Sequence, residues 1–439
     1  MKKMVKKFLF LTIFLSSVIF AHPWSCYHGN PQRTGLSPFV FGDSFEIIWT
    51  YNVGAQISGS AVVARGGKII FGARDGYLYC LSENGELLWR SPLSYTVWFS
   101  TPALDDTFNI YITDGRRLFK FDSTGRELWS WPSHNNLSIS HSPVIGQDGK
   151  IYFACYSDSL YALTPNGELA WARPLGSDVN SSPTIGYDGK IYVATTRGIG
   201  NWVLWAFTPD GSVSWAYPLA GEADFATPAV GPDSTIYAGA DSFLYAIRPD
   251  GTLKWRTTLS TKIQTCPAIA NESTIYVNAY NLYCLDTRSG NIRWVLPGIG
   301  SDYCAPAVDA NGNVFFGSNR VFYIVGPDGS IRCSRLIASS QSLFASPAIG
   351  ANQRIYIGHM NGIFYAFQGY STSFVLEHKT ISKKSFLKFL TLPNEKEIFK
   401  LYDFSGKLIK INSSIKNLPS GVYYLYKDNK KYFQKVIIK

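Results

Sequence analysis

The chain has 439 residues, of which 15% are aromatic and only 16% are charged, with 38 glycines and 22 prolines. This composition excludes intrinsic disorder and suits many short strands joined by tight turns. The formal charge of +10 is unevenly spread, because residues 22–370 hold 23 basic and 26 acidic residues, whereas residues 371–439 hold fourteen lysines and five acids. A nucleic-acid binder carries its positive charge on the folded binding face, so we expect no nucleic-acid partner.

Residues 1–21 predict a secretory signal peptide. Lysines at positions 2, 3, 6 and 7 precede an apolar run over 8–20, and Ala21 is a small residue suited to cleavage. The run is short for a membrane span, so we expect no transmembrane segment in the mature chain. Cys26 lacks the small apolar residues that precede a lipidated cysteine, which argues against a lipid anchor.

A unit of four short strands repeats between residues 58 and 367. Its clearest copy spans 182–215 and contains a Ser-Pro strand, an Ile-Tyr-Val strand, a Leu-Trp-Ala-Phe strand and, after an Asp-Gly turn, a strand with a central tryptophan. The spacing of that tryptophan, 39 to 44 residues, is typical of propeller blades. Its occurrences are Trp49, Trp89, Trp129, Trp171, Trp215, Trp255 and Trp294, with Cys333 in the eighth position. Recurrence in every blade favours packing between blades over a ligand-stacking role.

The two ends of the repeat array predict how the ring closes. The first tryptophan strand, 46–51, has no unit before it, and the last unit, 346–367, has no tryptophan strand after it. If the N-terminal strand completes the last blade, two exposed strand edges disappear. We therefore predict an all-β fold with an eight-bladed β-propeller over 22–370, closed by an N-terminal strand.

Seven cysteines are an odd number for an exported protein, so at least one stays unpaired. Cys80 and Cys284 take the alanine position of the third strand, which favours cysteine as a small buried hydrophobe. No cysteine spacing is typical of a zinc site or a redox pair.

The repeated unit resembles the pyrroloquinoline-quinone (PQQ)-like propeller repeat, on Ser-Pro-x-Ile-Gly-x-Asp-Gly-x-Ile-Tyr-Val at 182–193 and its copies. The segment 24–35, Trp-Ser-Cys-Tyr-His-Gly-Asn-Pro-Gln-Arg-Thr-Gly, is similar to the lead-in before such propellers. The resemblance covers about 22–370 and implies the fold. It decides little about function, because the family includes both quinoprotein dehydrogenases and plain scaffolds.

The features that the resemblance implies for a quinoprotein dehydrogenase are missing from this sequence. Those enzymes have a vicinal Cys-Cys pair, a calcium held by carboxylate and amide groups, and a catalytic aspartate. The chain has no adjacent cysteines and no clustered acidic segment that could supply several oxygen ligands. We expect no cofactor, no metal site and no catalytic residue.

One mouth of the ring should be lined by the residues that precede each Ser-Pro-type strand. These residues are Trp98, Phe99, His141, Asn180, Asp224, Phe225, Gln264, Tyr303 and Phe344. Their aromatic rings could stack on a sugar or on peptide side chains, or they could simply plug the channel. Asp224 and His141 could form an acid–base pair, but they belong to blades five and three and nothing in the sequence brings them together.

Blade four has a longer loop than its siblings, at residues 195–202. Insertions of this kind collect on one face of a propeller and often carry binding residues. Arg197 and Trp202 are the candidates here. The alternative is a tolerated change in loop length.

Residues 371–439 predict a small C-terminal β-sandwich with strands at 386–392, 397–403, 407–411, 422–427 and 432–438. The stretches 398–409, 418–424 and 435–439 resemble, in order, the C-terminal sorting domain of type IX secretion cargo. The resemblance implies the type IX secretion machinery as a partner, and a secreted or cell-surface location.

Three functions follow from these patterns. The leading hypothesis is an exported, monomeric, non-enzymatic propeller that binds a glycan or protein ligand as a binding or adhesion module. The alternative is a scaffold similar to the propeller subunit of the outer-membrane barrel-assembly machinery, against which the missing lipid-anchor signal and the export tail count. The third is a PQQ-dependent dehydrogenase.

Overall fold

The computed structural model describes residues 22–132, 138–139, 141–156, 159–196 and 202–370, together with the backbone of five strands beyond residue 371. The predicted signal peptide and Arg197 lie outside the described residues. Among the described residues all regular structure is β. Within that same part of the chain there is no helix long and apolar enough to cross a membrane.

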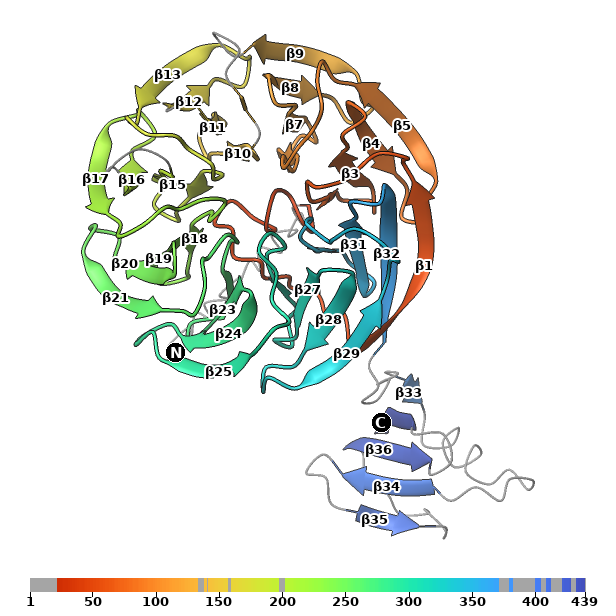
Figure 1. Cartoon of the computed structure of the whole chain (residues 1–439). Coiled ribbons are helices and arrows are strands. Elements are labelled where there is room, and N and C mark those ends of the chain that lie inside the picture. Colours follow the sequence, from red (N-terminus) through yellow and green to blue (C-terminus); the bar gives the residue numbers. More distant parts are fainter. Residues whose placement is uncertain are drawn as a thin grey trace, which may run out of the picture.

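Eight four-stranded sheets stand around a central axis as the blades of a propeller (Figure 1). Every blade is an antiparallel meander from an innermost to an outermost strand. Blades 1 to 4 are β2 (Val62–Val63), β3 (Ile69–Gly72), β4 (Tyr77–Leu81), β5 (Leu87–Pro92); β6 (Ala103–Leu104), β7 (Ile110–Thr113), β8 (Arg117–Phe121), β9 (Glu127–Pro132); β10 (Val144–Ile145), β11 (Ile151–Cys155), β12 (Ser159–Leu163), β13 (Leu169–Pro174); and β14 (Thr184–Ile185), β15 (Ile191–Ala194), β16 (Val203–Phe207), β17 (Val213–Pro218).

The remaining blades follow the same order, and the last one takes its outer strand from the start of the chain. Blades 5 to 8 are β18 (Ala229–Val230), β19 (Ile236–Ala240), β20 (Phe243–Ile247), β21 (Leu253–Thr258); β22 (Ala268–Asn271), β23 (Thr274–Ala279), β24 (Asn281–Asp286), β25 (Ile292–Leu296); β26 (Ala307–Val308), β27 (Val314–Ser318), β28 (Val321–Val325), β29 (Ile331–Leu336); and β30 (Ala348–Ile349), β31 (Arg354–Gly358), β32 (Ile363–Tyr370), β1 (Ser44–Asn52).

The predicted closure of the ring is confirmed. Strand β1 pairs antiparallel with β32, with Ser44 opposite Tyr370 and Asn52 opposite Ile363. The closing strand is anchored by aromatic side chains, because Phe45 packs against Phe322 of blade 7 and Phe367 of its own blade, with ring centroids 5.3 and 4.8 Å apart. The eight-bladed count also agrees with the sequence prediction.

The tryptophan and the turn glycine of the repeat form one device that joins neighbouring blades. The indole Nε1 of Trp171 donates to the carbonyl oxygen of Pro209 in the next blade, at 3.0 Å. The same indole lies under the turn glycine Gly211, where an added Cβ would stand 2.7 Å from the ring. Seven tryptophans repeat this arrangement, each on a glycine of the following blade: Gly85, Gly125, Gly167, Gly211, Gly251, Gly290 and Gly329. The expectation that these tryptophans pack between blades is confirmed.

The eighth tryptophan is missing for a topological reason. In blade 8 the outermost strand comes from the N-terminus, so no Asp-Gly hairpin joins β32 to β1. Cys333 of β29, in blade 7, takes the tryptophan position that faces blade 8, and it therefore has no turn glycine to pack against. It packs instead against the hydrophobic cluster that contains Phe45. Cysteine thus replaces tryptophan at the junction with blade 8, the blade whose outer strand closes the ring.

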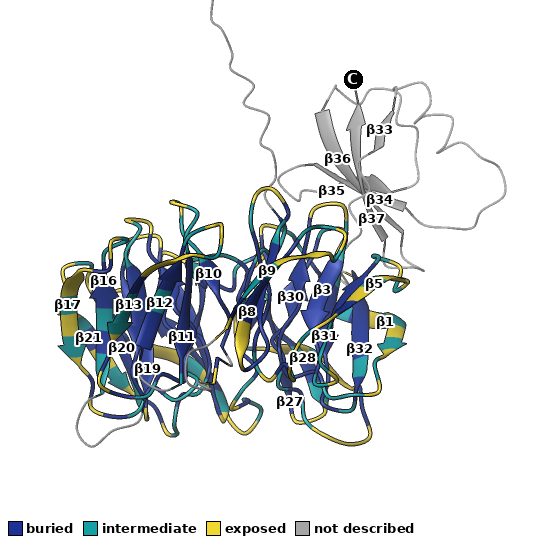
Figure 2. Ribbon diagram, turned by 90° about the horizontal axis from the view of Figure 1, so that it is seen from above, coloured by how far each residue is buried: buried dark blue, intermediate teal, exposed yellow. Residues whose placement is uncertain are grey.

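The core lies between the blades, where the inner strands of neighbouring sheets face one another. One cluster joins blades 1 and 2 and includes Leu78, Val97 and Ile110, all fully buried. Figure 2 shows the inner and middle strands buried, whereas the exposed residues gather on the loops and the outermost strands. Cys80 and Cys284 are buried in such clusters, as the sequence predicts.

Beyond residue 371 the described strands form one five-stranded sheet in the order β33-β37-β36-β34-β35. Their bounds are β33 (Lys379–Ile381), β34 (Phe399–Asp403), β35 (Leu408–Ile411), β36 (Gly421–Lys427) and β37 (Tyr432–Ile438). Four of them coincide closely with predicted strands, while β33, which pairs parallel with β37, is an addition. The predicted strand 386–392 lies outside the described residues, so the second layer of a sandwich stays a prediction.

Candidate functional site

A circle of hydroxyl groups fixes the innermost part of the ring. In six blades the residue at the serine position of the Ser-Pro signature accepts, through its side-chain oxygen, a hydrogen bond from the backbone N–H of the matching residue in the preceding blade, at 2.8–3.1 Å. The oxygens belong to Ser60, Thr101, Ser142, Ser182, Thr227 and Ser346. The circle is interrupted where Cys266 and Ala305 take this position. The serine of the Ser-Pro signature therefore joins neighbouring blades by a hydrogen bond.

The segment 24–37, which we call the lead-in segment, runs across the centre of the ring (Figure 1). Its backbone carbonyls accept hydrogen bonds of 2.7–2.9 Å from the innermost strands of six blades. The donors are the backbone N–H groups of Val63, Leu104, Ile185, Val230, Ile269 and Val308. One segment thus bonds to blades 1, 2, 4, 5, 6 and 7 and closes the channel from one side.

Arg33 fastens the lead-in segment to the blades. Its guanidinium is fully buried and donates to the carbonyl oxygens of Tyr27 at 2.7 Å, Pro143 at 3.2 Å and Pro183 at 3.1 Å. His28 is also fully buried, with its ring nitrogens 2.7 Å from the Arg33 carbonyl oxygen and 2.6 Å from that of Pro306. Burial lowers the pKa of His28 to about 4, whereas the two carbonyl acceptors on its ring nitrogens act in the opposite direction.

The opposite mouth is filled by four aromatic rings that meet across the axis. Phe99, Phe225, Tyr303 and Phe344 come from blades 2, 5, 7 and 8, and we call them the mouth cluster. The ring centroid of Phe225 lies 5.0 Å from that of Phe99 and 5.4 Å from that of Tyr303. Tyr303 in turn lies 4.6 Å from Phe344. These distances are those of packed aromatic pairs, so the rings contact one another.

The space left beneath the mouth cluster is small. The cluster, five serines and the lead-in residue Tyr27 are among the side chains that line a cavity of about 40 Å³. One water needs roughly 10–15 Å³ on this scale, so the cavity has room for a few waters. With the lead-in segment on one side and the mouth cluster on the other, little space is left along the axis of the ring.

Polar side chains on the same mouth form a chain across four blades. His141 lies with Nε2 2.6 Å from Oδ1 of Asn180, and Nδ2 of Asn180 donates to Oδ1 of Asp224 at 2.5 Å. Because Asn180 uses its nitrogen toward Asp224, His141 must be the donor in the first bond. Gln264 Nε2 donates to Oδ2 of Asp224 at 3.2 Å, and Lys262 lies 3.6 Å from the same oxygen.

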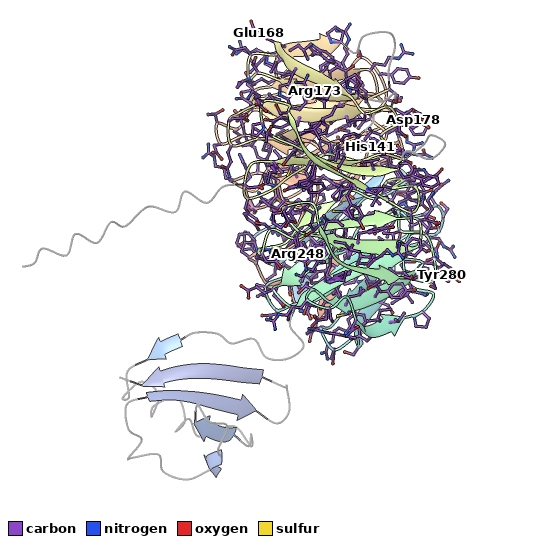
Figure 3. The ribbon with its side chains drawn as sticks, turned by 90° about the vertical axis from the view of Figure 1, so that its left-hand side faces the viewer. His141, Glu168, Arg173, Asp178, Arg248 and Tyr280 are labelled. Carbon is purple, nitrogen blue, oxygen red and sulfur yellow. The ribbon has the colours of Figure 1, made fainter. Side chains whose placement is uncertain are left out.

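The structure therefore links His141 and Asp224, which the sequence left apart, but through an amide rather than directly. Burial lowers the pKa of His141 to about 4, and its exposed fraction is 4%. A general base at neutral pH needs a pKa near 7 and access to its substrate. His141 has neither. The hydrogen-bonded row of His141, Asn180 and Asp224 therefore holds the loops of the mouth together. Figure 3 labels His141 and, for contrast, Tyr280, which is 58% exposed and lies at the rim of the molecule.

The remaining predicted site residues separate into two places. Trp98 turns away from the mouth cluster and is 43% exposed, with the guanidinium of Arg74 3.9 Å above its ring. Trp202 packs against the hydrophobic cluster of blades 4 and 5 and its backbone carbonyl accepts a bond from Leu219 N. The sequence identified residues 24–35 as a lead-in, but it did not predict that this segment crosses the ring and bonds to six blades.

The side chains at this mouth offer a quinone few groups to bind. The cavity is lined mainly by aromatic and hydroxyl side chains, and Lys262, beside the polar chain, is engaged with Asp224 and with Glu222 at 3.2 Å. Within the described residues there is no group of three or more His, Cys, Asp or Glu side chains placed to hold a metal ion.

Comparison with solved structures supports the fold. The BamB protein of Moraxella catarrhalis aligns with a TM-score of 0.62 and 15% identity, over 74% of this chain and 100% of that one. A europium-containing methanol dehydrogenase aligns with a TM-score of 0.65 and 14% identity, over 79% and 98%. The quinohemoprotein alcohol dehydrogenase of Comamonas testosteroni aligns with a TM-score of 0.65 and 12% identity, over 84% of each chain. At these identities the likeness concerns the fold alone.

Sequence comparison points to one family. The outer membrane protein assembly factor BamB of Nitrosomonas eutropha is 33% identical over 87 residues, which are 20% of this chain and about a fifth, 21%, of that relative's length. A family model described as outer membrane protein assembly factor BamB matches residues 43–198, 121–332 and 203–386, which together span most of the chain. The PQQ-like propeller repeat recognised in the sequence is confirmed, and the chain belongs to the BamB family of outer membrane protein assembly factors.

Proposed function

We propose that this protein is a non-enzymatic propeller that works as a protein-binding scaffold at the outer membrane. The observation that carries the proposal is the closed channel, with the lead-in segment on one side and the mouth cluster on the other. A propeller with a filled channel presents rigid loops and blade edges on which partners can bind, and it leaves no large pocket along the axis for a substrate. Membership of the BamB family supports the same function, which was the alternative hypothesis drawn from the sequence.

A second location is favoured by the C-terminal resemblance to type IX sorting domains. We propose that residues 371–439 engage the type IX secretion machinery, and that the propeller then reaches the cell surface as a binding or adhesion module. The order of the three matching stretches at the end of the chain supports this proposal. The two functions share a scaffold without catalysis and differ in the side of the membrane where it acts.

One experiment in the cells that make the protein tests the scaffold and its location. The full chain and a version ending at residue 370 are produced with an affinity tag, cross-linked with formaldehyde and fractionated. For the assembly scaffold, the full chain should be recovered in the outer-membrane fraction, cross-linked to outer-membrane proteins and protected from protease added to whole cells. Recovery only as a free monomer in a soluble fraction would contradict the scaffold.

The truncated chain tests the sorting tail in the same cells. If the tail directs export, the full chain becomes accessible to added protease or appears in the medium, and the version ending at residue 370 accumulates in the periplasm. If both versions distribute in the same way, residues 371–439 have no role in sorting. Since the last propeller strand ends at Tyr370, the truncation leaves every blade intact.

A further inference from the structure

Two exposed aromatic side chains lie on the loop that connects blades 1 and 2. Tyr95 and Trp98 are each 43% exposed, and together with Arg74 and Arg116 we call them the rim patch. Arg74 lies at the hairpin between β3 and β4, and Arg116 at the hairpin between β7 and β8. The rim patch therefore draws on two blades and the connection between them.

Each ring of the rim patch carries a guanidinium on its face. The Cζ atom of Arg74 is 3.9 Å from the centroid of Trp98, and that of Arg116 is 4.2 Å from the centroid of Tyr95. A cation over an aromatic face is held electrostatically by the ring. Tryptophan, tyrosine and arginine are also the residues that dominate the binding energy of protein interfaces.

The two positive charges of the rim patch lack a counter-ion in the described part of the chain. Neither Arg74 nor Arg116 forms an ion pair with a described carboxylate. Nη1 of Arg74 donates to Oε1 of Gln56 at 2.5 Å, while its Nε is buried with no hydrogen-bond partner.

The loop that carries the rings is fixed before any ligand arrives. Oδ2 of Asp114 accepts hydrogen bonds from Ser94 Oγ and Tyr95 N, both at 2.7 Å. On the other side Ser58 Oγ donates to the carbonyl oxygen of Trp98. A loop already held in its binding conformation loses little entropy when a partner docks.

We infer that the rim patch is a docking surface for a protein partner that presents carboxylate side chains between apolar ones. The apolar groups would cover Trp98 and Tyr95, and the carboxylates would pair with Arg74 and Arg116. The inference rests on the proposed function as a protein-binding scaffold and names the surface and the chemistry of its partner. It concerns side chains of blades 1 and 2 that do not belong to the mouth cluster.

A pair of synthetic peptides tests the rim patch. The probes are end-blocked, fluorescein-labelled decapeptides of alternating glutamate and phenylalanine, and of alternating lysine and phenylalanine, titrated with the full chain and followed by anisotropy. The glutamate peptide should bind and the lysine peptide should not. Arg74→Met and Trp98→Ala should each weaken binding of the glutamate peptide by about tenfold or more, since both belong to the contact.

The control is Arg256→Met, which removes a guanidinium stacked on Phe243 at 4.7 Å, on a different blade. It should leave peptide binding unchanged. Equal affinity for both peptides, no binding of the glutamate peptide, or unchanged binding by the Arg74 and Trp98 variants would overturn the inference. So would tighter binding of polygalacturonate than of the peptide, because the surface would then be one for acidic glycans.

This experiment can fail independently of the proposed function. If the peptide does not bind but the full chain still cross-links to outer-membrane proteins in cells, only the assignment of the surface is wrong. If the peptide binds as expected but no such cross-link forms, the scaffold function fails and the rim patch stands. The melting temperature of each variant is measured alongside, and values close to that of the unmodified chain show that the ring is intact.

Discussion

Replacing Arg33 by methionine should destabilise the propeller by about 3–5 kcal/mol, because it strips three buried carbonyl oxygens of a charged donor. The carbonyls of Tyr27, Pro143 and Pro183 belong to the lead-in segment and to blades 3 and 4, so the loss acts on the junction of all three. The measurement is the unfolding midpoint in guanidinium chloride, read by tryptophan fluorescence on the purified chain.

Two variants make this result specific. Arg33→Lys keeps the charge but not the planar fork of donors, so it should recover only part of the loss. Arg65→Met removes an exposed arginine that bonds to the carbonyl oxygen of Asp106, and it should change stability by less than about 0.5 kcal/mol. An Arg33→Met protein as stable as the Arg65→Met protein would show that the lead-in segment does not hold the ring together.

The second large effect is expected at the turn glycine Gly211, where alanine should cost about 2–5 kcal/mol. Two causes add up. The backbone has a φ of +84°, which costs an alanine about 1–2 kcal/mol, and the new methyl would stand 2.7 Å from Trp171, which forces the indole to shift at about 1–3 kcal/mol. Guanidinium unfolding of the purified chain again provides the measurement.

Gly176 separates the two causes. Its φ is +71°, but an added Cβ would meet nothing within 4 Å, so Gly176→Ala should show the backbone cost alone. In a Trp171→Ala background the extra cost of Gly211→Ala should disappear, which a double-mutant cycle measures. If Gly211→Ala and Gly176→Ala cost the same, the tryptophan–glycine contact does not join the blades.

The fold followed from the sequence because its determinants are local and repeated. The turn glycine and the tryptophan each recur in seven of the eight blades, and the mismatch between the strand at 46–51 and the unit at 346–367 predicted the closure. The meaning of the Ser-Pro signature was not accessible in the same way. A hydroxyl oxygen that accepts a hydrogen bond from the preceding blade is visible only when neighbouring blades are placed side by side.

The candidate site was predicted in its membership but not in its arrangement. The mouth position of Phe99, Phe225, Tyr303 and Phe344 could be read from the repeat, whereas their mutual contact depends on how four blades converge on the axis. Likewise, Trp98 stands next to Phe99 in sequence yet faces outward, because the loop turns between them. Single insertions such as the lead-in segment have no repeat to reveal their path.

A propeller with a filled channel that serves as a scaffold should neither bind a quinone nor use one. The most direct measurement adds PQQ and calcium ions to the purified full chain, follows the melting temperature and assays reduction of an electron-accepting dye with small alcohols. The account predicts no change in melting temperature and no dye reduction beyond that of the chain alone. A rise in melting temperature that saturates with PQQ and is accompanied by turnover would contradict it.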